Sequence, residues 1–219
     1  MSDYTVYTIG HSNISFDKFS TLLQTHDITA IADVRSTPYS KFTPQFNREA
    51  LQKSLHAIGI TYVFFGKELG ARSEDATCYT DNGQVIYSRL RETALFQQGI
   101  ERVINGAQKF RLALLCAEKE PFTCHRSILI GQALAANDVD VRHILHDGRV
   151  ETHEQMLQRL IAYMHKQRTP APAEMKDMFS SKETVIETTQ REQALQKIEQ
   201  QIAYINPLFN RVFIFNPTF

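Results

Sequence analysis

The chain has 219 residues, and its 24 Lys and Arg balance its 24 Asp and Glu, so the formal net charge is zero. This balance argues against a protein that coats duplex DNA through bulk charge, although a local basic groove stays open. With 42% apolar residues, nine Gly and seven Pro, the composition excludes disordered, collagen-like and repeat architectures. It predicts a globular chain with one main domain.

Compartment and membrane association follow from short segments and from the cysteines. The longest apolar run, Leu112 to Ala117, is far shorter than the roughly 20 residues that cross a bilayer. The first residues lack the basic and apolar regions of a secretory signal. Three cysteines, an odd number, do not make a disulfide framework and are expected as free thiols. We therefore expect no membrane association and a cytoplasmic, reducing location.

Short β-rich runs alternate with helical patterns along the first 166 residues. The predicted strands, in chain order, are 5–9, 30–34, 61–65, 111–116 and 141–145. The helical patterns between and after them cover 16–23, 48–58, 85–107 with a break at Gly99, 124–136 and 151–165. Strands separated by helix-length segments predict a three-layer α/β fold. Its central sheet should be mainly parallel, with about five strands and helices on both faces.

The composition changes after this predicted core domain, residues 1–166. We predict a Pro-rich linker at residues 167–182 and a C-terminal extension at residues 183–219, with a polar helix up to about residue 205 and a strand or docking segment at 209–215. The extension fits a tail packed on its own domain. It also fits a homodimer contact, because both arrangements bury the same apolar surface.

Reactive residue types follow each of the predicted strands. In an open parallel sheet, ligands bind outside the carboxyl ends of the strands, where the loops gather. Polar residues also occur there by chance, because loops are polar in any case. The residues at these ends are His11 and Ser12, Asp33 and Arg35, Lys67 and Glu68, Cys116 and Glu118, and His146 and Asp147.

The segment from Cys116 to Arg126 carries the strongest chemical signal. Thr123 is predicted as a helix N-cap, which places Cys124 at the first helical position and His125 and Arg126 in the first turn. The positive end of a helix dipole and cationic neighbours lower a cysteine pKa from about 8.5 to between 3.5 and 7.5. We therefore expect Cys124 to be a thiolate nucleophile, and Arg126 to orient an anionic group.

Less specific interpretations apply to the same cysteines. Cys116, at the end of an apolar strand, fits a core residue, Cys124 fits either role, and Cys78 is incidental. A zinc site would combine Cys116 and Cys124 with His125 and His11. The spacing C-x7-C-H matches none of the usual structural zinc patterns, so we predict neither a metal nor another cofactor.

Two loops offer further signals. Residues 36–48 interleave the aromatic Tyr39, Phe42 and Phe46 with Lys41 and Arg48, a mixture typical of single-stranded nucleic-acid binding. Hydrophobic anchoring of a lid explains this loop equally well. The glycines of 66–72 lack the spacing of a P-loop or of a dinucleotide fingerprint, so ATP hydrolysis and nicotinamide chemistry have no support.

Five ordered motifs carry a family resemblance: Thr8-Ile9-Gly10-His11-Ser12, Asp33-Val34-Arg35-Ser36, Pro44-Gln45-Phe46-Asn47, Gly66-Lys67-Glu68-Leu69-Gly70, and Cys116-Ala117-Glu118-Lys119 running to Cys124-His125-Arg126. Over roughly residues 4 to 165, the chain resembles the bacterial and archaeal family called "domain of unknown function 488". The resemblance implies a compact α/β domain with a shared polar cluster, and it implies no particular reaction.

These observations favour an enzyme with a cysteine-centred site for a small anionic, nucleotide-like substrate. Cys124 is the expected nucleophile, His11 or His125 the proton carrier, and Cys116 and Glu118 complete the catalytic set. One alternative is a binding module for phosphate or single-stranded nucleic acid, and another is a thiol redox or metal site. The residues predicted to bind substrate are Ser12, Asp33, Arg35, Tyr39, Lys67, Glu68, Arg72 and Arg126.

Overall fold

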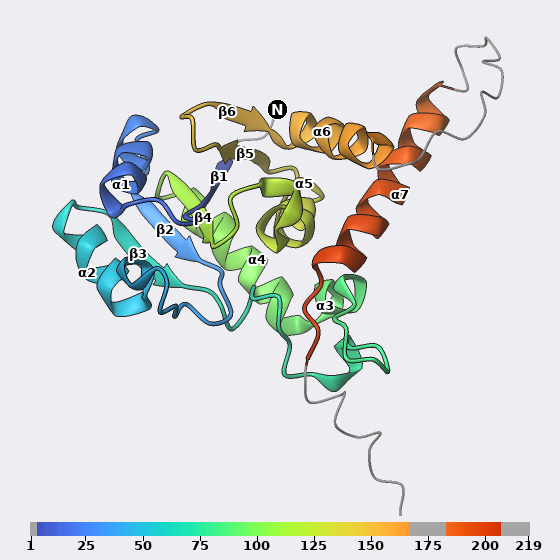
Figure 1. Ribbon diagram of the computed structural model, residues 1–219, viewed down its shortest axis with the longest axis horizontal. Coiled ribbons are helices and arrows are strands. Elements are labelled where there is room, and N and C mark those ends of the chain that lie inside the picture. The colour runs from blue at the N-terminus through green and yellow to red at the C-terminus, as the bar shows by residue number, and fades with distance from the viewer. Residues whose placement is uncertain (1–3, 167–182, 207–219) are drawn as a thin grey trace, which may run out of the picture.

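The computed structural model describes residues 4–166 and 183–206. A six-stranded sheet with the order β3-β2-β4-β1-β5-β6 forms its centre (Figure 1). The strands are β1 (Thr5–Gly10), β2 (Ala30–Asp33), β3 (Thr61–Phe64), β4 (Leu112–Cys116), β5 (Asp140–Ile144) and β6 (Val150–Thr152). Strands β1 to β5 are parallel, and β6 runs antiparallel to β5. The mainly parallel α/β sheet is confirmed, with one strand more than predicted.

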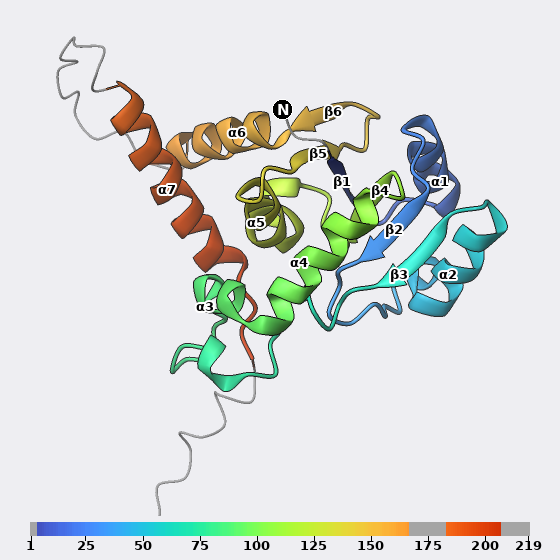
Figure 2. The ribbon, with the colours of Figure 1, turned by 180° about the vertical axis from the view of Figure 1, so that it is seen from behind.

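Helices cover both faces of this sheet (Figure 2). On one face, α1 (Phe16–Thr25) and α2 (Arg48–Ala57) pack on residues such as Ile9, Ile31 and Leu115. The other face carries a second core with Val6, Ala32 and Leu114. The elements on this second face are α3 (Tyr87–Glu92), α4 (Ala94–Ala107), α5 (Gln132–Ala135), α6 (His153–Lys166) and α7 (Glu183–Ile202). None of the helices in the described ranges is long and apolar enough to span a membrane.

The predicted helix over 85–107 is in fact two helices, and the prediction of a break at Gly99 is wrong. The chain breaks at Thr93, whose hydroxyl caps α4 by accepting the amide of Phe96 at 3.2 Å. Gly99 lies inside α4, where an added Cβ would come within 2.7–2.8 Å of side-chain atoms of Leu69 and Glu68. The glycine therefore permits close packing rather than ending a helix.

Residues 150–152 form strand β6, so the predicted helix 151–165 is wrong at its first two residues, 151 and 152. A turn with Gly148 at φ 86° reverses the chain after β5, and glycine adopts this conformation without strain. Helix α6 starts at His153, after a capping box in which the Thr152 hydroxyl accepts the Gln155 amide and the Gln155 side chain accepts the Thr152 amide.

The chain after Cys116 also differs from its prediction. A 3₁₀ turn, η3 (Pro121–Thr123), follows, and the Cys124 amide donates a hydrogen bond to its Pro121 carbonyl. The backbone of Cys124 is extended, with φ −134° and ψ 138°. A π-helical segment, η4 (Arg126–Gly131), then leads into α5. The Thr123 hydroxyl bonds to the Glu120 carbonyl and caps nothing. Cys124 therefore precedes the helix instead of opening it.

The C-terminal helix α7 lies beside α6 in both views (Figures 1 and 2). Ion pairs Arg191–Glu154 and Arg91–Glu199, each 2.9 Å, join α7 to α6 and α3. The following residues run back to the core domain, where the Val85 amide donates to the Tyr204 carbonyl at 2.9 Å. The predicted linker 167–182 and strand 209–215 lie outside the described residues. The homodimer contact therefore stays a prediction.

Candidate active site

A cleft opens where the carboxyl ends of β2 and β4 meet the C-terminal segment. Its volume is about 320 Å³, at the lower end of the range for small-ligand pockets. Its floor is built by residues at and after the end of β4. Its walls come from the loops at 35–37 and 71–72, from Tyr87 and from the C-terminal segment. The lining comprises residues 35–37, 71–72, 116–118 and 123–125, together with Tyr87, Ile202 and Tyr204.

Two thiols and a carboxylate meet on the floor of the cleft. The Sγ atoms of Cys116 and Cys124 lie 2.9 and 3.0 Å from the same atom, Oε2 of Glu118. Both cysteines are buried, with exposed fractions of 2% and 1%. The ligand-type atoms of these three residues and of His125 all lie within 4.8 Å of one another. We call these four residues the thiol cluster.

The pKa values of the two thiols in the cluster are shifted in opposite directions. Burial raises the pKa of Cys124, but the hydrogen bond from Cys116 and the charges of Arg126 and His125 outweigh it and hold this pKa well below its usual range. Burial, followed by the contact with Cys124, raises the pKa of Cys116 well above its usual range. Of the two thiols, Cys124 is therefore the one that ionises more readily.

His125 lies beside both thiols of the cluster. Its Nε2 lies 3.1 Å from the Val34 carbonyl and donates to it, and its Nδ1 faces Cys116 Sγ at 3.6 Å. Burial lowers the pKa of His125, but the hydrogen bond and charge of Cys124 and the charge of Glu118 outweigh it, so the pKa is raised. An imidazolium next to a thiolate is a pairing in which each charge stabilises the other.

Arg126 lies directly behind the thiol cluster and is fully buried. Its guanidinium donates to the main-chain carbonyls of Glu118 (2.7 Å) and Lys119 (3.1 Å), and its Nε has no partner in the described structure. Within the described ranges no carboxylate pairs with it. Although it was predicted to bind substrate, Arg126 does not line the cleft, so its charge reaches the site through the cluster.

Glycines bring the loops around the cluster close together. A Cβ on Gly10 would lie 1.8 Å from the Glu118 carbonyl oxygen, and one on Gly66 would lie 2.2 Å from the Arg35 carbonyl oxygen. A Cβ on Gly70 would lie 2.4 Å from the Ser36 hydroxyl. The glycine-rich segment 66–70 thus packs against the loop that follows β2, which explains its glycines without a phosphate.

A second network surrounds Arg35. Its Nε and Nη2 bind the two carboxylate oxygens of Asp33 at 2.8 and 2.6 Å, and Tyr62 donates to the same carboxylate at 2.7 Å. Nη1 of Arg35 donates to Nε2 of His11 at 3.1 Å, while His11 Nδ1 donates to the Ser12 carbonyl at 2.7 Å. Burial, followed by the charge of Arg35, lowers the pKa of His11 to about 4. His11 is therefore neutral at pH 7, mainly because it is buried.

The upper wall of the cleft combines a cation with aromatic rings. The guanidinium of Arg72 lies 4.3 Å from the ring centroid of Tyr204 and 3.4 Å from the Thr37 hydroxyl. Across the described residues, no carboxylate pairs with Arg72. The hydroxyl of Tyr87 is buried and has no hydrogen-bond partner in the described structure. A buried hydroxyl without a partner is costly unless a ligand completes it.

The sequence pattern of the family described as "Domain of unknown function DUF488" matches residues 15–133. This match covers more than half of the chain. The chain belongs to the DUF488 family. No curated protein and no solved structure matches it.

The DUF488 match includes the whole thiol cluster and Arg126, and it excludes His11 and Tyr204. The cleft is therefore built partly by the family domain and partly by the C-terminal segment of this chain. Tyr87 and Tyr204 are the functional candidates that the sequence did not single out. Tyr87 lay within a helical pattern, and Tyr204 lay in an extension without any motif.

The structure brings together only some of the predicted site residues. Arg35, Arg72, Cys116, Glu118, Cys124 and His125 line the cleft. His11, Asp33 and Arg126 contact these residues from behind. The remaining four have other surroundings: Ser12 follows β1, Tyr39 donates to Glu49, Glu68 pairs with Arg102, and Lys67 is exposed.

The thiol cluster has the donor types that a zinc ion takes, so its fit to a metal can be tested by distance. Oxygen and sulfur ligands of one tetrahedral zinc stand about 3.5 Å apart, given the usual zinc–ligand bond lengths. Here the Glu118 oxygen lies 2.9 and 3.0 Å from the two sulfurs. These are hydrogen-bond distances, and they are shorter than the spacing of two ligands on one zinc ion.

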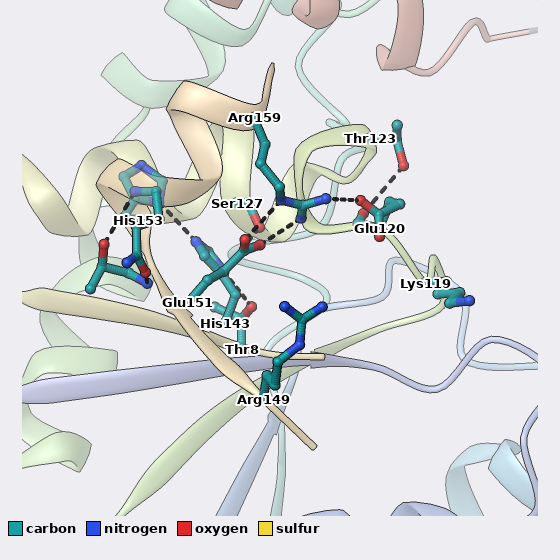
Figure 3. A network of polar contacts seen from close by, with 12 residues as sticks. Thr8, Lys119, Glu120, Thr123, Ser127, His143, Arg149, Glu151, His153 and Arg159 are labelled. Atoms are coloured by element: carbon teal, nitrogen blue, oxygen red, sulfur yellow. Dashed lines mark hydrogen bonds and ion pairs between the residues drawn. The ribbon is translucent and has the colours of Figure 1, made fainter. Parts of the chain in front are cut away.

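A third polar network lies between β5, β6 and α6 (Figure 3). His143, fully buried, contacts the Thr8 hydroxyl at 2.8 Å and His153 Nδ1 at 3.1 Å. Arg159 bridges Glu151 and Glu120 at the edge of a pocket of about 690 Å³. The acids that line this pocket pair with Arg159 and Arg149, so the pocket offers a mixed-charge surface.

Proposed function

We propose that this DUF488 protein is a cysteine-dependent enzyme in which the Cys124 thiolate attacks an electrophilic centre of a small anionic substrate. The observation that carries the proposal is the position of the Cys124 sulfur. It lies on the floor of the cleft, beside His125 and with the buried cation of Arg126 behind it. A thiolate held in this way is the reactive form of cysteine.

The charges around Cys124 account for its activation. Glu118 alone would oppose a thiolate, because two like charges a hydrogen bond apart repel each other. Arg126 and His125 supply two positive charges against it, and both lower the pKa of Cys124. Burial raises the pKa of Glu118, which weakens its preference for the charged form beside the thiolate. The balance favours ionisation at Cys124.

Two groups are placed to move a proton at the cluster. His125 faces the sulfurs through Nδ1, and the Glu118 carboxylate contacts both of them. Of the two histidines considered from the sequence, we assign the proton to His125. His11 Nε2 accepts from Arg35 and its Nδ1 donates to a carbonyl, which leaves no free nitrogen facing the thiols.

Substrate binding falls to the upper part of the cleft. Arg72 lines it with no carboxylate of the described chain in contact, so its charge is available to an anion. The charge of Arg35 is already matched by the bidentate contact with Asp33. The buried Tyr87 hydroxyl offers a further hydrogen bond. We therefore place the anionic group of the substrate next to Arg72 and Tyr87.

Alkylation by iodoacetamide over a range of pH tests the nucleophile. Cys124 should react with an apparent pKa well below the ordinary thiol value of about 8.5. Peptide mass mapping assigns the label, and buried Cys78 serves as the internal comparison. The Cys124→Ser variant should lose the fast phase. An apparent pKa of Cys124 at or above about 8.5 would remove the case for this enzyme.

An exposed aromatic loop favours a second candidate, the binding of single-stranded nucleic acid. Phe42 is 84% exposed, with the Lys41 ammonium 5.3 Å from its ring centroid, and Tyr39 is 54% exposed. Bases stack on such rings while cations contact the phosphates. Oligonucleotide binding at low salt that weakens with added salt and with Phe42→Ala would support this candidate. No binding at low salt would exclude it.

A further inference from the structure

We propose that Cys116 is the resolving thiol for Cys124, so that the cleft reduces a small anionic disulfide while the protein's own pair becomes a disulfide. This inference rests on the proposed function and names its substrate class. It assigns a chemical role to the residue that the sequence left between a core position and a reagent.

The geometry of the two sulfurs carries the inference. They lie within 4.8 Å of each other, line the same cleft and share one carboxylate oxygen. Cys116 ends strand β4, while Cys124 lies in an extended segment between a 3₁₀ turn and a helix. A disulfide needs a sulfur–sulfur distance of about 2.05 Å. Rotation of the two side chains, together with a shift of the segment holding Cys124, would close the gap.

The first step is a thiol–disulfide exchange. The Cys124 thiolate attacks one sulfur of the substrate, R–S–S–R′, and a bond forms between Cys124 and the R-bearing sulfur as the S–S bond breaks. The second half leaves as the thiolate R′–S⁻. The enzyme now holds a mixed disulfide, and no external oxidant is required because the substrate accepts the electrons.

The second step uses Cys116 and Glu118. The Cys116 thiol transfers its proton to the Glu118 carboxylate, which lies 2.9 Å away, and the resulting thiolate attacks Cys124 Sγ. The Cys116–Cys124 disulfide forms as R–S⁻ leaves. The substrate has gained two electrons and the protein has lost two, so a thiol reductant must restore the dithiol before the next turnover.

Glu118 fits the task of proton acceptor. It is the only carboxylate among the described residues that hydrogen-bonds to both sulfurs. Burial raises its pKa, which makes it a stronger base than an ordinary carboxylate. A group so placed accelerates the step in which Cys116, the less acidic thiol, must ionise. Loss of this carboxylate should therefore slow the second step and spare the first.

The experiment uses the full chain, after reduction and desalting, with 5,5′-dithiobis(2-nitrobenzoate), an anionic disulfide whose leaving thiolate absorbs visible light. The unmodified protein should release two equivalents of thiolate from the cluster. The second release should not depend on reagent concentration, because it is intramolecular. The product should carry no adduct, and its mass should be lower by two hydrogens. Peptide mapping should join Cys116 to Cys124.

Variants separate the two proposals. Cys116→Ser should release one equivalent and retain a stable adduct on Cys124, and Cys116→Ala should do the same if serine disturbs folding. Cys124→Ser should lose the fast release. If the unmodified protein keeps a stable adduct on Cys124, the resolving role is overturned and the nucleophile stands. If Cys124 does not react quickly in any form, both proposals fall.

Two further measurements bear on mechanism. Glu118→Gln should slow the second release by at least about tenfold and leave the first unslowed. The matched control is Glu120→Gln, since Glu120 pairs with Arg159 and contacts neither thiol; equal slowing in both variants would overturn the role of Glu118. Thiols that react only after a chelator has removed a stoichiometric metal ion would overturn the redox role.

Discussion

Arg126 holds the main chain of Glu118: its guanidinium donates to the Glu118 carbonyl at 2.7 Å and to the next carbonyl at 3.1 Å. The same residue contributes a positive charge that lowers the pKa of Cys124. One buried side chain therefore holds the loop that carries the carboxylate and favours ionisation of the thiol beside it. These two roles can be separated by substitution.

Arg126→Met should raise the apparent pKa of Cys124 by roughly one unit or more, because an opposite charge close to an ionised group shifts its pKa by about 1–3 units. Alkylation at neutral pH should slow accordingly. Arg126→Lys keeps the charge and should keep part of the shift, although it loses the paired carbonyl contacts. Equal pKa values in both variants would show that loop geometry, and not charge, controls the thiol. Iodoacetamide titration provides the measurement.

Gly10→Ala should destabilise the fold, since the new Cβ would meet the Glu118 carbonyl oxygen at 1.8 Å. Overpacking of this kind costs about 1–3 kcal/mol, and the shift of the Glu118 loop should also slow thiol alkylation. Gly106→Ala is the matched control, because its nearest neighbour would lie at 3.5 Å. In helix α4 that change should stabilise by about 0.5–1 kcal/mol. Urea unfolding compares the two, and similar losses in both would contradict the steric argument.

The buried histidines predict that the free energy of unfolding falls as the pH drops below about 6.5. Burial lowers the pKa of His153 to about 4, with a further lowering by Arg191, and burial also lowers the pKa of its neighbour His143 well below the ordinary value. The unfolded chain then binds protons that the folded chain excludes. Between pH 6.5 and 4, each such histidine therefore removes stability, by about 2 kcal/mol at pH 5 for His153.

Urea denaturation at pH 7 and pH 5 measures this loss. His153→Gln should make the stability less dependent on pH, since glutamine cannot take up the proton in the unfolded chain. His56→Gln, on the exposed side of α2, should leave the dependence unchanged. An unaltered loss in His153→Gln would assign the acid sensitivity to other groups.

Tyr87→Phe should affect stability and reactivity in opposite directions. Its hydroxyl is buried without a partner in the described structure, so removing it should stabilise the protein by about 1 kcal/mol. If the hydroxyl contacts the bound anion, the same change should slow the reaction with the anionic disulfide and leave that with neutral iodoacetamide unchanged. A variant that is more stable and reacts equally with both reagents would remove Tyr87 from the substrate site.

Local patterns were sufficient to predict most of the elements. Apolar alternation and helical spacing depend on neighbouring residues only, and five strands and the main helices follow from them. The errors occurred where a contact between residues far apart in the sequence decides the local structure. Gly99 allows α4 to pack closely against Leu69, and the short strand β6 forms because it pairs with β5. The gathering of Cys116, Cys124 and Glu118 was foreseeable because they follow one strand within nine residues.

By itself, the sequence determined the α/β alternation, the parallel sheet and the set of reactive side chains at its edge, because each of these depends on periodicity or on a strand end. Only the tertiary structure decided which contacts these side chains make. It directed Arg126 to main-chain carbonyls, paired Arg35 with Asp33, and set Tyr204 against Arg72 across more than a hundred residues. The burial and the electrostatic environment of a side chain depend on all of its neighbours in space, and a local pattern along the chain does not contain this information.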